Sequence, residues 1–77
     1  FAMQLYEKLR VMRTTLNMSR PVLAEALGIP FTSYKNWEMN YRSVPADLLL
    51  RIYNHSDSRI SAFGPFLLDA KQTRFLG

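Results

Sequence analysis

The chain has 77 residues, with 10 lysines and arginines against 6 acidic residues and a formal net charge of +4. This length allows one small domain, and a hydrophobic content of 48% excludes a disordered tail. With no cysteine and a single histidine, His55, the chain lacks the parts of disulfide frameworks, thiol catalysis and cysteine–zinc fingers. The positive charge favours an anionic partner, although a soluble domain without such a partner explains it equally well.

Two amphipathic helices are predicted in the first third of the chain. Leu5, Leu9, Met12 and Leu16 recur every three or four residues, which is the spacing of one buried helix face. A second helix is expected from the N-cap Ser19, with Pro21 in its first turn and Gly28 after its end. Its expected buried side consists of Leu23, Ala26 and Leu27.

A third helix is predicted over residues 31–39, after a Gly28-Ile29-Pro30 break. Pro30 stands where a serine or threonine cap is usual, so backbone stiffness has to begin this helix. The helical period places Tyr34, Trp37 and Glu38 on the inward side. We therefore interpret both aromatic rings as core residues and not as a platform for stacked bases.

The second half of the chain is predicted to hold a fourth helix and a less regular tail. Pro45 opens the helix, and its apolar face consists of Leu48, Leu49, Ile52 and Tyr53. Residues 54–58 read as a polar loop that places His55 on the surface. A short helix from Pro65 is the preferred prediction for the tail, with an extended segment as the alternative. We accordingly divide the chain into residues 1–56, a DNA-binding unit, and residues 57–77, a dimerising or core-covering extension.

Two short helices joined by a glycine-containing turn are typical of a helix-turn-helix, whose second helix reads the major groove of DNA. The outer face of the third helix has suitable chemistry, since asparagine pairs with adenine, lysine donates to guanine and threonine offers its methyl group to thymine. The predicted base-reading residues are Phe31, Thr32, Ser33, Lys35 and Asn36. The alternative is a solvated helix face without a ligand.

Contacts to the DNA backbone are expected at both ends of this motif. Arg20 stands at the start of the second helix, where backbone N–H groups favour phosphate. Asn40, Tyr41 and Arg42 follow the third helix and are predicted to grip the flanking phosphates. An ordinary polar loop and a solvated arginine are the alternatives. Glu38 needs a partner if it is buried, and Arg13 of the first helix is the candidate for a structural ion pair.

These residues resemble the lambda repressor-like family of Cro/repressor or XRE type. The resemblance runs from about Leu5 to Tyr53 and rests on Leu9-Arg10 before the motif, on Ser19 to Ile29, and on Trp37-Glu38. It implies a compact all-α domain of four to five helices that binds operator DNA as a dimer. It also implies an Arg13–Glu38 pair, a phosphate contact at Arg20, and base readout from Phe31, Thr32, Lys35 and Asn36. The chain departs from the family pattern at Arg20-Pro21, at Pro30 and at Phe31.

We therefore expect a transcriptional regulator, in particular a repressor, that binds a palindromic operator on double-stranded DNA as a homodimer. The expected dimer interface consists of Phe63, Phe66, Leu67, Phe75 and Leu76, and covering of the core is the alternative role for this tail. No cofactor, metal, small-molecule ligand or membrane contact is expected, and no spanning segment or signal peptide is recognised. The expected location is the cytoplasm of a bacterium or phage host, on the nucleoid. An antitoxin-like protein-interaction module is the alternative function, and an enzyme is not expected.

Overall fold

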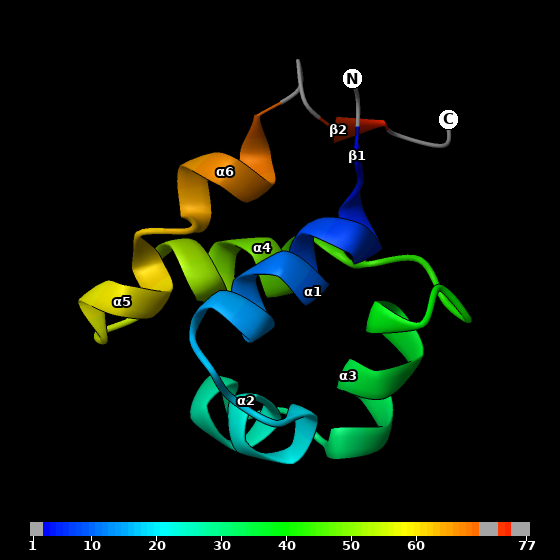
Figure 1. The fold of residues 1–77 in the computed structure, drawn as a ribbon, viewed down its shortest axis with the longest axis horizontal. Coiled ribbons are helices and arrows are strands. Elements are labelled where there is room, and N and C mark those ends of the chain that lie inside the picture. Colours follow the sequence, from blue (N-terminus) through cyan, green and yellow to red (C-terminus); the bar gives the residue numbers. More distant parts are fainter. Residues whose placement is uncertain (1–2, 70–72, 75–77) are drawn as a thin grey trace.

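The computed structural model describes residues 3–69 and 73–74 and shows an all-α domain, as the sequence predicts. The helices are α1 (Leu5–Thr15), α2 (Arg20–Leu27), α3 (Phe31–Glu38), α4 (Ala46–Tyr53), α5 (Ser58–Ser61) and α6 (Gly64–Leu68). Two residues of extended chain at each end, β1 (Met3–Gln4) and β2 (Thr73–Arg74), pair in parallel. In Figure 1, α1 runs through the middle of the domain, with α2 and α3 below it and α6 above.

The predicted signals at the helix ends account for where α2 begins and ends and for where α3 and α4 begin. The Ser19 hydroxyl accepts a hydrogen bond from the Val22 N–H at 3.4 Å and so caps α2, with Pro21 in its first turn. Gly28 ends α2 in the left-handed conformation, at a φ of 70°. No side chain caps α3, which begins directly after Pro30. Pro45 likewise immediately precedes the first residue of α4.

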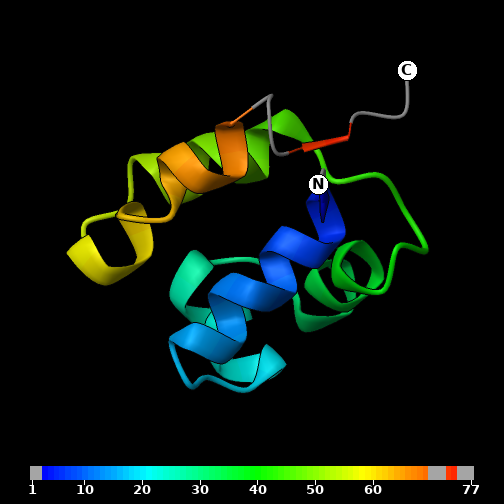
Figure 2. The same cartoon turned by 45° about the horizontal axis from the view of Figure 1, so that its top comes forward.

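The hydrophobic core draws on all six helices. Its fully or nearly fully buried members are Leu9, Met12, Leu23, Ala24, Leu27, Tyr34, Leu48, Leu49, Ile52, Ile60 and Leu67. Ile60 of α5 and Leu67 of α6 are both 0% exposed. Residues 57–69 therefore complete the core of residues 3–56, and the described chain does not divide into two units at residue 56. Figure 2 shows α6 lying along α4, with α1 between this pair and the α2–α3 layer.

Three predictions of buried or interface residues are wrong. Ala26 is exposed, and Ala24 takes its place in the core at 1% exposure, because α2 meets the other helices over a slightly rotated face. Tyr53 is 48% exposed, although its ring lies against Gly64 of α6. Leu67 cannot be a dimer contact, because the protein's own helices enclose its side chain completely.

The tail after residue 56 contains one helix that was predicted and one that was not. The short helix expected from Pro65 is confirmed as α6. The preceding helix, α5, begins after Asp57, whose carboxylate accepts a hydrogen bond from the Arg59 N–H at 2.9 Å. Gly64 lets α6 approach α4 closely, because an added Cβ would lie 2.5 Å from Cδ2 of Tyr53. Phe75 and Leu76, predicted as interface residues, lie outside the described residues.

A buried lysine joins α1 to α6. The Lys8 side chain is 0% exposed, and its Nζ donates to the carbonyl oxygens of Phe66 at 2.7 Å and Asp69 at 3.2 Å. The ammonium also lies 4.9 Å from the centre of the Phe66 ring. Burial lowers the pKa of Lys8, and the charge of Asp69 opposes that shift. Lys8 thus binds carbonyl groups at the C-terminal end of α6, where a cation is favourable.

Within residues 3–69 and 73–74, no helix combines the length and the apolar character needed to cross a membrane. The same described residues contain no group of three or more His, Cys, Asp and Glu side chains placed to hold a metal ion.

Candidate nucleic-acid interface

The connection between α2 and α3 turns the chain in three residues. The Gly28 and Ile29 N–H groups donate to carbonyl oxygens of the last turn of α2, both at 3.0 Å. Ile29 then packs against the core, and Pro30 sets the extended backbone from which α3 starts. In Figure 1, α2 crosses the lower part of the domain and α3 rises at its right-hand end. The predicted helix, turn and helix are therefore present, and α2 and α3 pack against each other.

A buried carboxylate holds these two helices against α1. Glu38 is 0% exposed, and Arg13 donates to both of its oxygens, from Nε at 2.8 Å and from Nη2 at 3.0 Å. The predicted ion pair between Arg13 and Glu38 is thus present with bidentate geometry. Arg13 also donates from Nη1 to the Met18 carbonyl oxygen at 3.1 Å, which fixes the loop between α1 and α2.

The same carboxylate binds a second arginine that the sequence did not assign to it. Nε of Arg20, at the start of α2, donates to Oε1 of Glu38 at 2.9 Å. Glu38 therefore links the N-terminal end of α2 and the C-terminal end of α3 to α1. The Arg20 side chain is still 34% exposed, so it remains at the surface while its Nε is engaged.

The protonation of this cluster follows from its partners. Burial by itself would raise the pKa of Glu38, but hydrogen bonds from Arg13 and Arg20 outweigh burial, and the pKa lies below the ordinary 4.5. Burial raises the pKa of the neighbouring Tyr34 hydroxyl, and the negative charge of Glu38 raises it further. This hydroxyl is buried beside the Glu38 carboxylate. At neutral pH, Glu38 is accordingly an ionised carboxylate, and Tyr34 is a neutral phenol.

The predicted base-reading side chains are at the surface. Phe31 is 43% exposed and Thr32 is exposed, while Ser33, Lys35 and Asn36 are partly exposed. The buried side of α3 consists of Tyr34 and Glu38. The division of α3 into an inner packing side and an outer polar side is therefore confirmed, whereas contact with bases stays a prediction.

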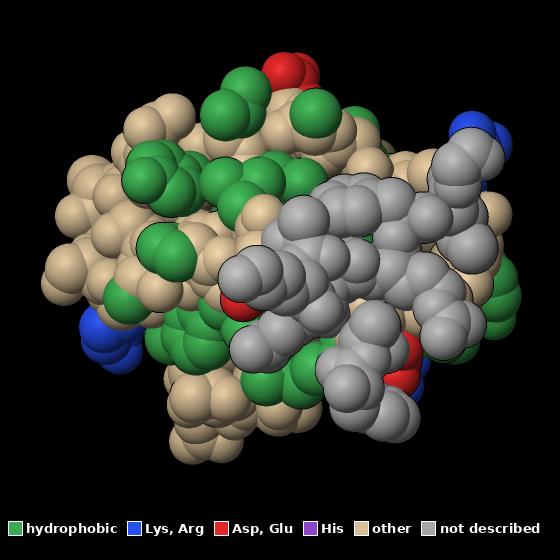
Figure 3. Space-filling view, turned by 90° about the horizontal axis from the view of Figure 1, so that it is seen from above, with side chains coloured by type: hydrophobic (Ala, Val, Ile, Leu, Met, Phe, Trp, Pro, Cys, Tyr) green, Lys and Arg blue, Asp and Glu red, His purple; other side chains and the backbone are tan. Residues whose placement is uncertain are grey.

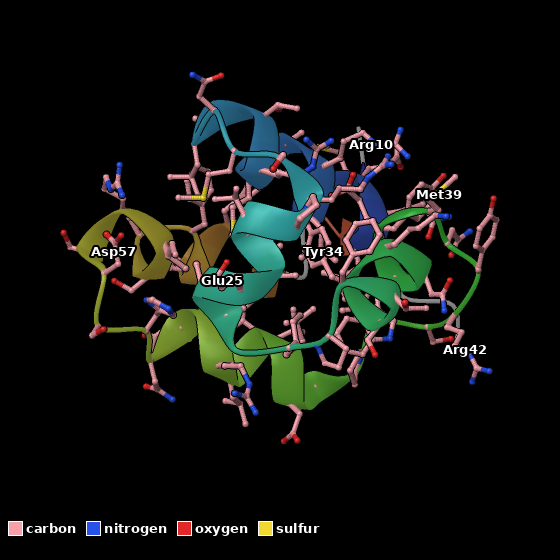
Figure 4. The ribbon with its side chains drawn as sticks, turned by 90° about the horizontal axis from the view of Figure 1, so that it is seen from below. Arg10, Glu25, Tyr34, Met39, Arg42 and Asp57 are labelled. Atoms are coloured by element: carbon pink, nitrogen blue, oxygen red, sulfur yellow. The ribbon has the colours of Figure 1, made fainter. Side chains whose placement is uncertain are left out.

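The loop after α3 is held tightly at its start and exposed at its tip. Asn40 adopts a left-handed conformation, at a φ of 61°, which asparagine tolerates better than most residues. The N–H groups of Tyr41 and Arg42 both donate to the Asn36 carbonyl oxygen, at 2.8 and 3.2 Å. The Tyr41 side chain is 66% exposed, and Arg42 projects away from the domain in Figure 4. The loop thus presents the two predicted phosphate-binding side chains beside α3.

Cations surround α3, and its single carboxylate is buried. Arg10 of α1 lies near the C-terminal end of α3, with its Nη2 3.5 Å from the Glu38 carbonyl oxygen. Lys35 belongs to α3 itself. Arg42 follows in the loop, and Figure 4 shows Arg10 and Arg42 on the same side of the domain as α3. The charge of Glu38 is offset by Arg13 and Arg20. Cations therefore lie near the C-terminal end of α3, whereas the exposed Asp47 of α4 shares a pocket with Trp37 of α3.

Two further polar links near the turn were not predicted. The Arg51 guanidinium of α4 donates to the Leu27 carbonyl oxygen at 3.3 Å, at the C-terminal end of α2. Nε2 of His55 lies 2.8 Å from the Ala26 carbonyl oxygen, and its Nδ1 accepts from the Asp57 N–H at 3.0 Å. His55 is therefore partly exposed and links the loop after α4 to the last turn of α2. No sequence signal marks either link, because both partners are backbone carbonyl groups more than twenty residues away.

Comparison of the chain with models of protein families, with curated proteins and with solved structures finds no match.

Proposed function

We propose that the protein is a sequence-specific double-stranded DNA-binding regulator, in particular a repressor, that places α3 in the major groove. We further propose that the chain belongs to the lambda repressor-like family and binds a palindromic operator as a homodimer. Its proposed location is the nucleoid of a bacterium or phage host. Such a protein acts by occupying DNA and needs no catalytic group.

One observation carries this proposal. A salt-bridged framework made of Arg13, Glu38 and Arg20 fixes α3 against α1 and α2, and yet α3 keeps a surface of mixed hydroxyl, amide and ammonium groups exposed. A helix held rigidly by one side, with polar groups on the other and cations around it, meets the requirements of direct base readout. The reading side chains are Phe31, Thr32, Ser33, Lys35 and Asn36.

The phosphate contacts follow from the same geometry. Arg20 and the loop residues Asn40, Tyr41 and Arg42 lie at the same end of the α2–α3 unit, because Arg20 binds Glu38 at the C-terminal end of α3 and the loop follows Glu38 directly. They are therefore suited to one phosphate backbone beside the groove. These contacts set the position of α3 and supply the affinity that salt weakens.

The experiment that tests the function is selection of bound duplexes from a random pool. Enrichment of a palindrome with half-sites about one helical turn apart is the expected result. An unenriched pool would remove the sequence-specific function. The Lys35→Ala/Asn36→Ala double variant, compared on the selected and a scrambled duplex, then tests readout, because loss of bidentate base contacts lowers discrimination by about 1–3 kcal/mol per contact. A control substitution at the exposed Glu25 should leave the discrimination intact.

The protein-interaction module is a weaker second proposal. This function would require an exposed apolar surface on the C-terminal third of the chain for partner binding. Ile60 and Leu67 of that third are instead buried in the domain's own core. Burial of these side chains removes much of the surface that a toxin-like partner would need.

A further inference from the structure

The outer side of α4 carries an apolar stripe that the core does not use. Ala46, Leu50 and Tyr53 follow one another at intervals of four and three residues, so they share one side of the helix. Leu50 is 54% exposed and Tyr53 is 48% exposed. The buried residues of α4 are Leu48, Leu49 and Ile52. Leu48 and Ile52 lie on the other side of the helix, and Leu49 lies beside the Tyr53 edge of the stripe. The stripe is thus a second hydrophobic face on a helix whose first face is already packed.

Helix α6 widens this stripe into a surface. Gly64 at the start of α6 lies against Tyr53 at the end of α4, so α6 runs back along α4. Leu68, one turn after Gly64, is 43% exposed, and Figure 2 shows that α6 runs from the end of α4 back toward its start. Figure 3 shows hydrophobic side chains gathered over this part of the molecule. We refer to Ala46, Leu50, Tyr53 and Leu68 as the α4 surface.

The charges beside the stripe are arranged in a self-complementary way. Asp47 and Arg51 are exposed, one turn apart, on the flank of α4 away from α6. A two-fold axis at the level of Leu49, the residue midway between Asp47 and Arg51, would lay a second α4 antiparallel to the first and bring the two Leu50 side chains next to each other. Since residues equally far before and after Leu49 then face each other, Asp47 of each copy comes opposite Arg51 of the other. An unrelated partner would not need this symmetry of charge.

The position of α4 also suits a DNA-binding dimer. In Figure 4, α2 and α3 lie toward the viewer while α4 forms the lower edge of the domain. A two-fold axis along the line of sight at that edge turns the α2–α3 units of both copies to the same side. This step depends on the proposed DNA-binding function, whereas the apolar stripe and the charges do not.

We propose that the α4 surface is the site at which a second copy of this chain binds. The first test is sedimentation of the wild type and of Leu50→Glu without DNA, over a range of protein concentrations. The wild type is expected to form a dimer, and Leu50→Glu a monomer that keeps the helical circular-dichroism spectrum and a cooperative unfolding transition. Val22→Glu is the matched control, because Val22 is 51% exposed on α2 and its variant should remain dimeric. A monomeric wild type, or a dimer that tolerates Leu50→Glu, would overturn the proposal.

The second test uses the paired charges. Asp47→Arg and Arg51→Asp each place like charges opposite one another in a homodimer, so each variant alone should be a monomer. An equimolar mixture of the two should dimerise again, because every facing pair is then of opposite charge. The intrahelical repulsion and the lost Arg51–Leu27 hydrogen bond persist in the mixture, so damage to the fold cannot explain recovery. A mixture that stays monomeric contradicts the antiparallel arrangement.

These outcomes are separable from those of the proposed function. If the protein forms a dimer that depends on Leu50 but shows no DNA sequence specificity, the α4 surface is supported and the proposed regulator function is refuted. If the wild type and Leu50→Glu bind a selected palindrome at the same protein concentrations and with the same stoichiometry, the regulator function is supported and the α4 surface is refuted. Binding of a different protein to the α4 surface in place of a second copy would also refute it.

Discussion

Glu38 shows how one buried charge can organise three helices. Its carboxylate is shielded from solvent and accepts three hydrogen bonds from Arg13 and Arg20, which belong to α1 and α2. A buried carboxylate without such partners would be costly, so the ion pairs and the packing of α3 form together. The residue thereby determines where α3 stands on the surface.

Replacing Glu38 by Gln should destabilise the domain by about 3 kcal/mol, because it leaves two arginines facing an uncharged amide in a largely enclosed site. Urea unfolding followed by circular dichroism measures the change. The matched control is Glu25→Gln on the exposed side of α2, which should alter the free energy of unfolding by less than about 0.5 kcal/mol. Equal effects of the two substitutions would contradict the organising role of Glu38.

The Glu38 contribution should also depend on pH in a defined direction. Because its folded pKa is lowered, the stabilisation is complete above the unfolded pKa near 4.5 and is lost as the pH falls through the folded value. The difference in unfolding free energy between the wild type and Glu38→Gln should therefore narrow from neutral to strongly acidic pH. A constant or widening difference would mean that Glu38 is not held ionised by its arginines.

Arg20 is the residue whose two roles need to be separated. Its hydrogen bond to Glu38 is structural, and its exposure leaves it beside the proposed phosphate path. Arg20→Ala should weaken binding to all duplexes and reduce the salt slope of log K by about 1, the effect of one lost phosphate contact. A stability loss with an unchanged salt slope would assign Arg20 to the framework alone.

At the scale of helices, the contact between α4 and α6 depends on one missing side chain. A Cβ on Gly64 would lie 2.5 Å from Tyr53 Cδ2 and 3.0 Å from Tyr53 Cα, and the backbone atom cannot move aside as a side chain can. Gly64→Ala should therefore destabilise the domain by about 1–3 kcal/mol through overpacking. Thermal and urea unfolding measure this effect.

The control for Gly64 uses Ala62, the residue that follows α5. Ala62→Gly removes a side chain at an exposed position and should change stability by about 1 kcal/mol or less. If Gly64→Ala were neutral, α6 would have room to move off α4, and the close approach would not limit the fold.

At the scale of the whole molecule, Leu67 distinguishes a domain that is complete in one chain from one completed by dimerisation. Leu67→Ala should cost about 2–5 kcal/mol, because the side chain is fully enclosed by its own chain. That loss should be the same at every protein concentration, because association through another surface would stabilise the wild type and the variant equally. A loss that disappears at high concentration would place Leu67 in an interface after all.

The sequence predicted best those features that neighbouring residues determine. Ser19, Pro21, Gly28 and Pro45 act through their own backbone or the next turn, so the starts of α2 and α4 and the end of α2 were correct. Tyr34 was placed inward by helical period alone. Ala26 was wrong, because the period indicates the Leu23–Leu27 face of α2 but not which flank of that face, Ala24 or Ala26, meets the other helices.

The tertiary structure decided which distant groups meet. Lys8 reaches a carbonyl oxygen 58 residues away, and Arg20 reaches a carboxylate 18 residues away, and neither link leaves a local pattern in the sequence. The sequence by itself therefore determined the helices, the turn and the polar outer side of α3, because these follow from short-range sterics and periodicity. Only the folded chain decided that residues 57–69 join the core and that α4 keeps a second apolar side, because burial depends on what the rest of the chain has already covered.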